Sequence, residues 1–190
     1  MNKSESKYYN TACLLDEALL VLLDKKEFKY ITVKEICEKA GVNRSTFYLH
    51  YETTADLLQE TIEYLIKELQ SKYKNSNLFN VNEYTLDKLL LFTPEYSIPY
   101  LEFIKKHKKA FMAAQAQPNV FSVDSTFNKM FKKLFVPMLE RYGVPDSEKK
   151  FIVKFYINGI HAIINEWIKD GCKEEIPFIA NLIVKCVNHN

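Results

Sequence analysis

Glycine and long apolar runs are scarce in this chain. Only four of its 190 residues are glycine, although 47% are hydrophobic. Glycine supplies the tight turns and bulges of β-proteins, so its scarcity favours a fold made of helices. No apolar stretch approaches the roughly 18 residues that a membrane-spanning helix needs, and the polar start MNKSESK lacks the apolar centre of a signal peptide. We therefore expect a cytoplasmic protein that has no membrane partner.

The sequence also lacks the patterns that mark metal sites and enzymes. Cys13, Cys37, Cys172 and Cys186 have no metal-ligand spacing and lie in apolar helical patterns, as buried thiols of a reducing compartment do. There is no glycine-rich phosphate loop, no nucleophile elbow and no prominent carboxylate pair. We therefore predict no cofactor, no metal and no enzymatic activity.

The most informative stretch is ITVKEICEKAGVNRSTFYLHY, at residues 31–51. Thr32 and Glu35 have the spacing of a capping box that opens a helix. Gly41 then stands where a helix ends in a left-handed residue, and Asn43 is placed to cap the next helix. Two short helices joined by a turn of three or four residues with glycine form a helix-turn-helix, whose second helix enters the major groove of DNA.

This stretch resembles the signature of the TetR/AcrR transcriptional regulators. The matching run is V-K-E-I-C-E-K-A-G-V-N-R-S-T-F-Y-L-H-Y, followed by Asp-Leu-Leu at 56–58, and the likeness extends from about Tyr9 to about Leu69. It implies an all-α fold, in which an N-terminal three-helix helix-turn-helix domain is joined to a C-terminal helical domain for ligand binding and dimerisation. One position departs from the pattern: Thr54 stands where many members carry a lysine that holds a DNA phosphate.

The resemblance also implies which side chains face DNA. Arg44 is the candidate for reading a base, because arginine forms paired bonds with guanine. Thr46 and Tyr48 match phosphate contacts, which position a protein without specifying sequence. Phe47 and Tyr51, four residues apart, are expected in the core. The full predicted DNA-binding set is Thr32, Arg44, Ser45, Thr46, Tyr48, His50 and Thr54.

Charge gives this DNA-binding half little additional support. Residues 1–53 contain eight Lys/Arg and eight Asp/Glu, so their formal charges cancel. A DNA-binding domain usually carries a clear basic excess. We therefore expect modest non-specific affinity for DNA and a shallow dependence of binding on salt.

Helical periodicity and its interruptions divide the chain. A first helix is expected from about Thr11 to Lys26, and Thr53 with Asp56 forms a second capping box that opens a longer helix. The asparagine-rich segment NSNLFNVN, residues 75–82, is the best candidate for a boundary. The expected organisation is a helix-turn-helix DNA-binding domain at 1–53, a connecting helix at 54–74, and an effector-binding and dimerisation domain at 75–190.

The second half of the chain is helical again and is interrupted by prolines. Pro94 and Pro99 bracket residues 95–98, which we expect to be a loop, since an interior proline costs a helix about 3 kcal/mol. Further helices are expected at 100–116, as one or two, and at 121–142, 147–170 and 177–187.

The last two helices are predicted to form a dimer interface. The run FYINGIHAIINEWIKDG, at 155–171, also resembles the C-terminal domain of one TetR subgroup in which these helices dimerise. A glycine inside a helix costs about 1 kcal/mol against alanine, so Gly159 indicates close approach of another backbone. The predicted interface residues are Phe155, Gly159, Ile160, Ile163, Trp167, Ile179, Leu182 and Ile183.

An effector cavity is the second expectation that the resemblance carries for this half. Ligand pockets are mostly apolar with few polar groups. The candidates for lining it are Tyr100, Phe103, Phe127, Phe131, Phe155 and Asn158. Aromatic residues at helical spacing also serve simply as core. The lysines of residues 105–109 are interpreted as a solvated helix face, with a DNA-proximal surface or an acidic partner as the alternative.

These observations lead to one hypothesis and two rivals. The chain is expected to be a transcriptional repressor that binds a palindromic double-stranded DNA operator as a homodimer and is released by an unknown small-molecule effector. In the first rival it is a co-activator whose C-terminal domain binds a protein partner. In the second it is a ligand-binding protein that no longer binds an operator, as Thr54 and the missing basic excess suggest.

Overall fold

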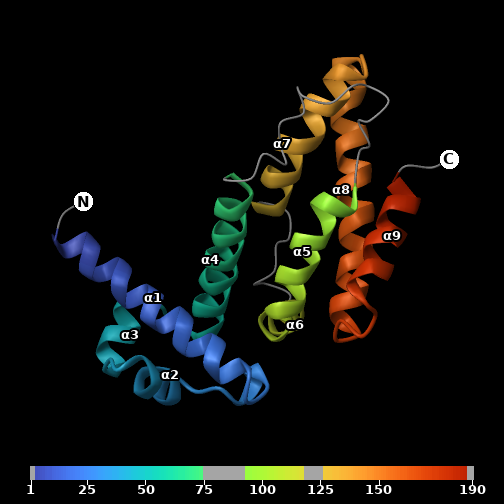
Figure 1. Cartoon of the computed structure of the whole chain (residues 1–190). Coiled ribbons are helices and arrows are strands. Elements are labelled where there is room, and N and C mark those ends of the chain that lie inside the picture. Colours follow the sequence, from blue (N-terminus) through green and yellow to red (C-terminus); the bar gives the residue numbers. More distant parts are fainter. Residues whose placement is uncertain (1–2, 75–92, 118–125, 188–190) are drawn as a thin grey trace. The chain divides into compact units, whose positions relative to one another are not determined.

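The computed structural model describes residues 3–74, 93–117 and 126–187 (Figure 1), and over these ranges the chain contains helices and no strand. The expected all-α fold class is confirmed. The helices are α1 (Lys3–Leu23), α2 (Val33–Ala40), α3 (Arg44–His50), α4 (Thr54–Lys74), α5 (Pro94–Lys106), α6 (Lys108–Gln115), α7 (Thr126–Arg141), α8 (Asp146–Lys169) and α9 (Ile176–Val187), with a short 3₁₀ turn at Phe28–Tyr30.

The chain divides into two compact units. Unit 1 comprises Met1–Leu65 and Lys109–Ser122, and unit 2 comprises Ile66–Lys108 and Val123–Asn190. Helix α4 therefore belongs to unit 1 over its first half and to unit 2 over its second half. The polar segment 75–82, where we expected a boundary, lies outside the described residues.

Unit 1 is built around the buried face of α1, against which α2 packs, with α3 packed on α2. Its core includes the fully buried side chains of Leu15, Leu19, Ile36 and Phe47. Among them lies one buried polar pair that joins α1 to α4. The hydroxyl of Thr61 donates to the carboxylate of Asp16 over 2.7 Å, and the carbonyl of Leu57 lies 2.8 Å from the same hydroxyl.

Helix α1 begins earlier than the expected Thr11. The hydroxyl of Thr11 donates to the carbonyl of Lys7, one turn back, so Thr11 lies inside the helix and does not cap it. The helix also ends at Leu23, three residues before Lys26, because the chain continues as turns from Asp24. The other helix boundaries of this unit agree with the capping residues that predicted them.

Unit 2 packs α5 against α9, α7 against α8, and α8 against α9. The expected loop at 95–98 was wrong, because these residues belong to α5. Pro94 occupies the first turn, where a proline loses no hydrogen bond. Pro99 removes one backbone hydrogen-bond donor from α5. The side chains of Tyr100, Leu101 and Ile104, which follow it, are buried, and this packing outweighs the cost of the proline.

Helix α6 starts immediately after α5, at the basic run of residues 105–109. Two of these lysines are held by the turn between α8 and α9, which gives the run a structural role beyond solvation. The ammonium group of Lys108 donates to the carbonyl of Gly171 over 3.2 Å, and Lys105 lies 4.0 Å from the carboxylate of Glu175.

Within the described ranges, every helix is either too short or too polar to cross a bilayer.

Candidate functional site

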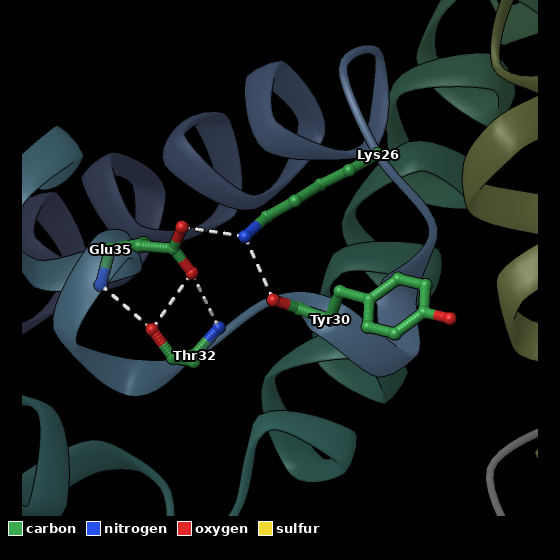
Figure 2. A network of polar contacts seen from close by, with 4 residues as sticks. All are labelled: Lys26, Tyr30, Thr32 and Glu35. Carbon is green, nitrogen blue, oxygen red and sulfur yellow. Dashed lines mark hydrogen bonds and ion pairs between the residues drawn. The ribbon is translucent and has the colours of Figure 1, made fainter.

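The helix-turn-helix opens with a closed network of polar contacts that includes the predicted capping box (Figure 2). The backbone N–H of Glu35 donates to the hydroxyl of Thr32 at 3.3 Å, and the N–H of Thr32 donates to the carboxylate of Glu35 at 3.0 Å. Lys26, in the turn that follows α1, donates to the other carboxylate oxygen and to the carbonyl of Tyr30. This lysine therefore ties the start of α2 to the turn after α1.

The two halves of the motif are joined by the expected glycine turn. Gly41 adopts a left-handed conformation, with φ +69°, and its N–H donates to the carbonyl of Cys37. Asn43 then caps α3: its side-chain oxygen accepts from the N–H of Thr46 at 2.7 Å. The same oxygen also accepts from the hydroxyls of Ser45 and Thr46. Both hydroxyl protons are therefore committed to the cap.

Helix α3 presents a clear inner side and outer side. Phe47 is fully buried and marks the inner side. At about 100° per residue, Ser45 and Leu49 each lie about 160° from Phe47 and so form the middle of the outer side. Tyr48, on one flank, is 57% exposed, and Leu49 is 78% exposed. Arg44 is also exposed, and no hydrogen bond or ion pair holds its guanidinium within the described residues.

The remaining predicted DNA-facing residues are less open. The hydroxyl of Thr32 donates to Glu35, and half-buried Thr54 is the first residue of α4, which the Thr53–Asp56 box caps. The ring of His50 stacks on Tyr8 of α1, with centroids 3.8 Å apart, and burial lowers the pKa of this histidine. The ring of His50 is therefore held against α1.

Ion pairs remove part of the positive charge near this motif. Lys29 pairs with Glu27 at 2.8 Å, and Lys34 pairs with Glu38 at 3.7 Å. All four side chains are largely exposed, so these contacts contribute little to stability. They nevertheless place a carboxylate beside each ammonium group, which agrees with the cancelling charges seen in the sequence.

Unit 2 exposes a stripe of apolar and small residues on each of its last two helices. On α8 it contains Phe151, Phe155 and Gly159, at successive turns, with the two phenylalanines 66% and 72% exposed. On α9, Phe178 is 59% exposed and half-buried Leu182 lies one turn further on. Helices that place large aromatic side chains in solvent along one stripe are typical of an interaction surface.

Other residues of the predicted interface are already buried inside the chain. Ile160, Ile179 and Ile183 are at most 4% exposed. Trp167 is 2% exposed, and its indole N–H donates to the carbonyl of Glu174. These four residues therefore belong to the buried core and not to the exposed stripes. Gly159 has no described atom within 4 Å of the position where a Cβ would stand, so the close backbone approach that we expected is not made within the chain.

Between α7 and α8, the described residues line an open groove of about 670 Å³. Its apolar floor includes Val136, Val153 and Ile157, and Phe151 stands at its side. Its polar residues are mostly cationic: Lys132, Lys149, Lys150 and Lys154, with Asp146. Lys149 is paired with Asp146 at 2.6 Å, which leaves three lysines that form no ion pair within the described part of the chain.

Of the predicted effector-binding residues, the four whose side chains are described do not line this groove. Tyr100 and Phe103 are buried in α5, whereas Phe155 and Asn158 are exposed on α8. The side chains of Phe127 and Phe131 lie outside the described residues. The sequence reasoning missed the groove because its lysines come from two helices and were not considered together. It also passed over Leu49, which is apolar and has no assigned place in the motif.

Comparison with known proteins agrees with this architecture. Residues 15–61 match the model of "Bacterial regulatory proteins, tetR family", and residues 93–189, about half of the chain, match "Transcriptional regulator C-terminal region". Among solved structures, the dihydroxyacetone kinase operon activator DhaS superposes with a TM-score of 0.61, covering 93% of this chain and 96% of DhaS at 19% identity. That level of identity shows a shared fold.

Two curated relatives come from Bacillus subtilis (strain 168). The uncharacterized HTH-type transcriptional regulator YxbF is 32% identical over 120 residues, which cover 63% of this chain and 28% of YxbF. The uncharacterized HTH-type transcriptional regulator YerO is 37% identical over 54 residues, covering 28% of this chain and 19% of YerO. The chain thus spans less than a third of the length of either relative. With both family models matched, the chain belongs to the TetR family of transcriptional regulators, and α2 and α3 are its DNA-binding helix-turn-helix.

Proposed function

We propose that this regulator binds a palindromic operator as a homodimer and represses transcription until a small molecule releases it. The observation that carries the DNA-binding part is the exposure of two polar side chains on α3. Arg44, at the start of the helix, and Tyr48, on its flank, are both exposed, and the cap at Asn43 and the buried Phe47 hold the helix in place. Base reading is assigned to Arg44 and phosphate contact to Tyr48.

Four other predicted DNA contacts, Ser45, Thr46, Thr32 and His50, already make contacts within the chain. Ser45 and Thr46 already donate their hydroxyl protons to Asn43, so contact with a phosphate oxygen requires those hydroxyls to rotate. Thr32 is placed similarly, because its hydroxyl donates to Glu35. His50 has its ring on Tyr8, and we assign it to holding the end of α3 against α1.

Dimerisation is assigned to the exposed stripes of α8 and α9. Phe155 and Phe178 expose large apolar surfaces, and Gly159 leaves room for a partner helix to approach. Ile163 and Leu182 are half-buried at the edge of the same stripes. A two-fold dimer would present two recognition helices to half-sites about 34–36 Å apart, or a small multiple of that distance, on one face of DNA.

The effector is proposed to be an anionic small molecule with an apolar part. The groove between α7 and α8 supports this class, because its floor is apolar and Lys132, Lys150 and Lys154 supply positive charge that no described carboxylate neutralises. Such a ligand would oppose operator binding through a coupling free energy on the order of 1–3 kcal/mol.

A second candidate function keeps the DNA-binding unit and replaces the small molecule with a protein. The same lysines would then contact an acidic protein surface, and the regulator would activate transcription. DhaS, a protein of the same fold, is named an operon activator, which is that sign of regulation. Thermal unfolding across a panel of carboxylic and phosphorylated metabolites separates the two candidates. A true effector at 100 times its dissociation constant adds about 2.7 kcal/mol to stability.

The central experiment measures binding of the purified protein to DNA from upstream of its own gene by fluorescence anisotropy, at two salt concentrations. Operator binding predicts one fragment that resists competitor DNA at both salts. Binding that is weak for every fragment and lost at the higher salt contradicts a local operator and favours the protein-partner function.

A further inference from the structure

Leu49 is the most exposed large apolar side chain of the described residues, at 78%. It stands on the seven-residue helix α3, one turn after Ser45, and almost opposite the buried Phe47. A single exposed leucine is common on protein surfaces and needs no explanation by itself. Its position matters here, because a recognition helix lies in the major groove of DNA, and Leu49 stands in the middle of the side of α3 that faces away from the core.

The neighbours of Leu49 leave few groups able to read bases. The hydroxyl protons of Ser45 and Thr46 are committed to Asn43. His50 is stacked on Tyr8, and only Arg44 offers an unengaged polar group that suits a base edge. The middle of the outer side of α3 therefore presents an isobutyl group, and the guanidinium of Arg44 lies apart from it at the start of the helix.

Major-groove chemistry supplies one apolar feature that matches an isobutyl group. Thymine carries a methyl group at C5, and the other three bases present only donors, acceptors or a C–H there. We propose that Leu49 packs against the C5 methyl group of a thymine in each half-site and selects thymine over cytosine at that position. This inference rests on the proposed operator binding and names the base that one further residue reads.

The expected size of the effect follows from the size of the group. Burying one methyl-sized group changes an equilibrium constant by about fourfold. A dimer that reads two half-sites should therefore lose roughly 15-fold in affinity when both methyl groups are removed. Because Leu49 is exposed, replacing it should not disturb the fold, and thermal unfolding of Leu49→Ala should match that of the wild type.

The test uses DNA selected by the protein itself. Duplexes are enriched from a random-sequence library with the wild-type protein, and the tightest one becomes the probe for anisotropy. Each thymine is then replaced by uracil, which keeps the hydrogen bonds and removes only the methyl group. We expect one symmetric pair of positions where uracil weakens wild-type binding about 15-fold, and where Leu49→Ala binds thymine and uracil equally.

A matched variant and a reverse substitution sharpen the result. Leu14→Ala removes another exposed leucine, on α1, and should leave the discrimination against uracil unchanged. In a probe that carries cytosine at the sensitive positions, replacing that cytosine with 5-methylcytosine should restore the affinity of the wild-type protein but not the affinity of Leu49→Ala.

The outcomes separate this inference from the function beneath it. If no sequence is enriched, operator binding fails and the Leu49 contact fails with it. If a sequence is enriched but contains no thymine, or no uracil substitution weakens binding, only the Leu49 contact is overturned. Persistence of the uracil penalty in Leu49→Ala overturns it as well.

Discussion

Single residues of α3 divide into those that hold the helix and those that face outward, and helical spacing predicted much of this division. Phe47 and Tyr51 were expected in the core, and both are buried. The stack of His50 on Tyr8 was not predictable, because it joins residues 42 positions apart whose meeting depends on how α1 packs. Spacing within one helix gives the direction of a side chain, and only tertiary structure gives its neighbour.

Replacing Arg44 should weaken operator binding without changing dimerisation. Loss of a paired contact with a guanine costs about 1–3 kcal/mol, so Arg44→Ala should bind its operator roughly 5- to 150-fold more weakly per half-site. Arg44→Lys is the matched control: it keeps the charge but not the paired geometry, and should recover only non-specific binding. Anisotropy measures both, and wild-type affinity in Arg44→Ala would contradict the base-reading role.

The carboxyl group of Glu35 should titrate unusually low. Hydrogen bonds from Lys26 first, and then from Thr32, lower its pKa from 4.5 to about 2. A lowered carboxyl pKa contributes stability that is present above pH 4.5 and is lost as the pH falls through 2. A carbon-13 NMR titration of labelled glutamates should find this pKa near 2. In Lys26→Met it should rise towards the ordinary value, and an unshifted wild-type value would contradict the network.

At the scale of whole elements, caps were predicted more reliably than helix interiors. The capping residues Thr32, Asn43 and Thr53 all make the bonds that their sequence pattern indicates, because a cap depends on a few adjacent residues. Pro99 misled the same reasoning. Whether a helix tolerates an interior proline depends on the apolar surface buried around it, and that surface comes from distant parts of the chain.

Removing the cap of α3 should destabilise unit 1. The side-chain oxygen of Asn43 accepts three hydrogen bonds, and replacing such a cap with alanine costs about 0.5–2 kcal/mol. Thermal unfolding should show a lower midpoint for Asn43→Ala, while Asn43→Asp, which preserves the accepting oxygen, should unfold close to the wild type. Equal midpoints for Asn43→Ala and wild type would mean that α3 is held by Phe47 and its neighbours alone.

For the molecule as a whole, the sequence identified the two helices proposed for dimerisation but did not resolve their exposed sides. Apolar residues nearly surround α8, so helical spacing alone did not separate Ile160, which is buried within the chain, from Phe155, which is exposed. The groove lysines could not be grouped from the sequence for a related reason. Lys132 belongs to α7 and the others to α8, and only the packing of the two helices brings them to one groove.

A charge placed in the exposed stripe should separate the proposed dimer. Central interface aromatic residues typically contribute 2 kcal/mol or more, so Phe155→Glu should raise the dimer dissociation constant at least about 30-fold. Analytical ultracentrifugation measures the change. Tyr142→Glu, which alters an exposed aromatic residue just after α7, is the control and should remain dimeric. A Phe155→Glu variant that sediments like the wild type would place the interface elsewhere.

The buried pair of Asp16 and Thr61 also limits how early unit 1 can fold during translation. The two residues are 45 positions apart. A ribosome that adds 5–20 residues each second makes Thr61 about two to nine seconds after Asp16. Until then the carboxylate lacks this donor, so the buried pair that joins α1 to α4 cannot form. The DNA-reading unit therefore matures only once synthesis has passed into the helix that it shares with unit 2, and a nascent chain that stops at residue 53 should stay open.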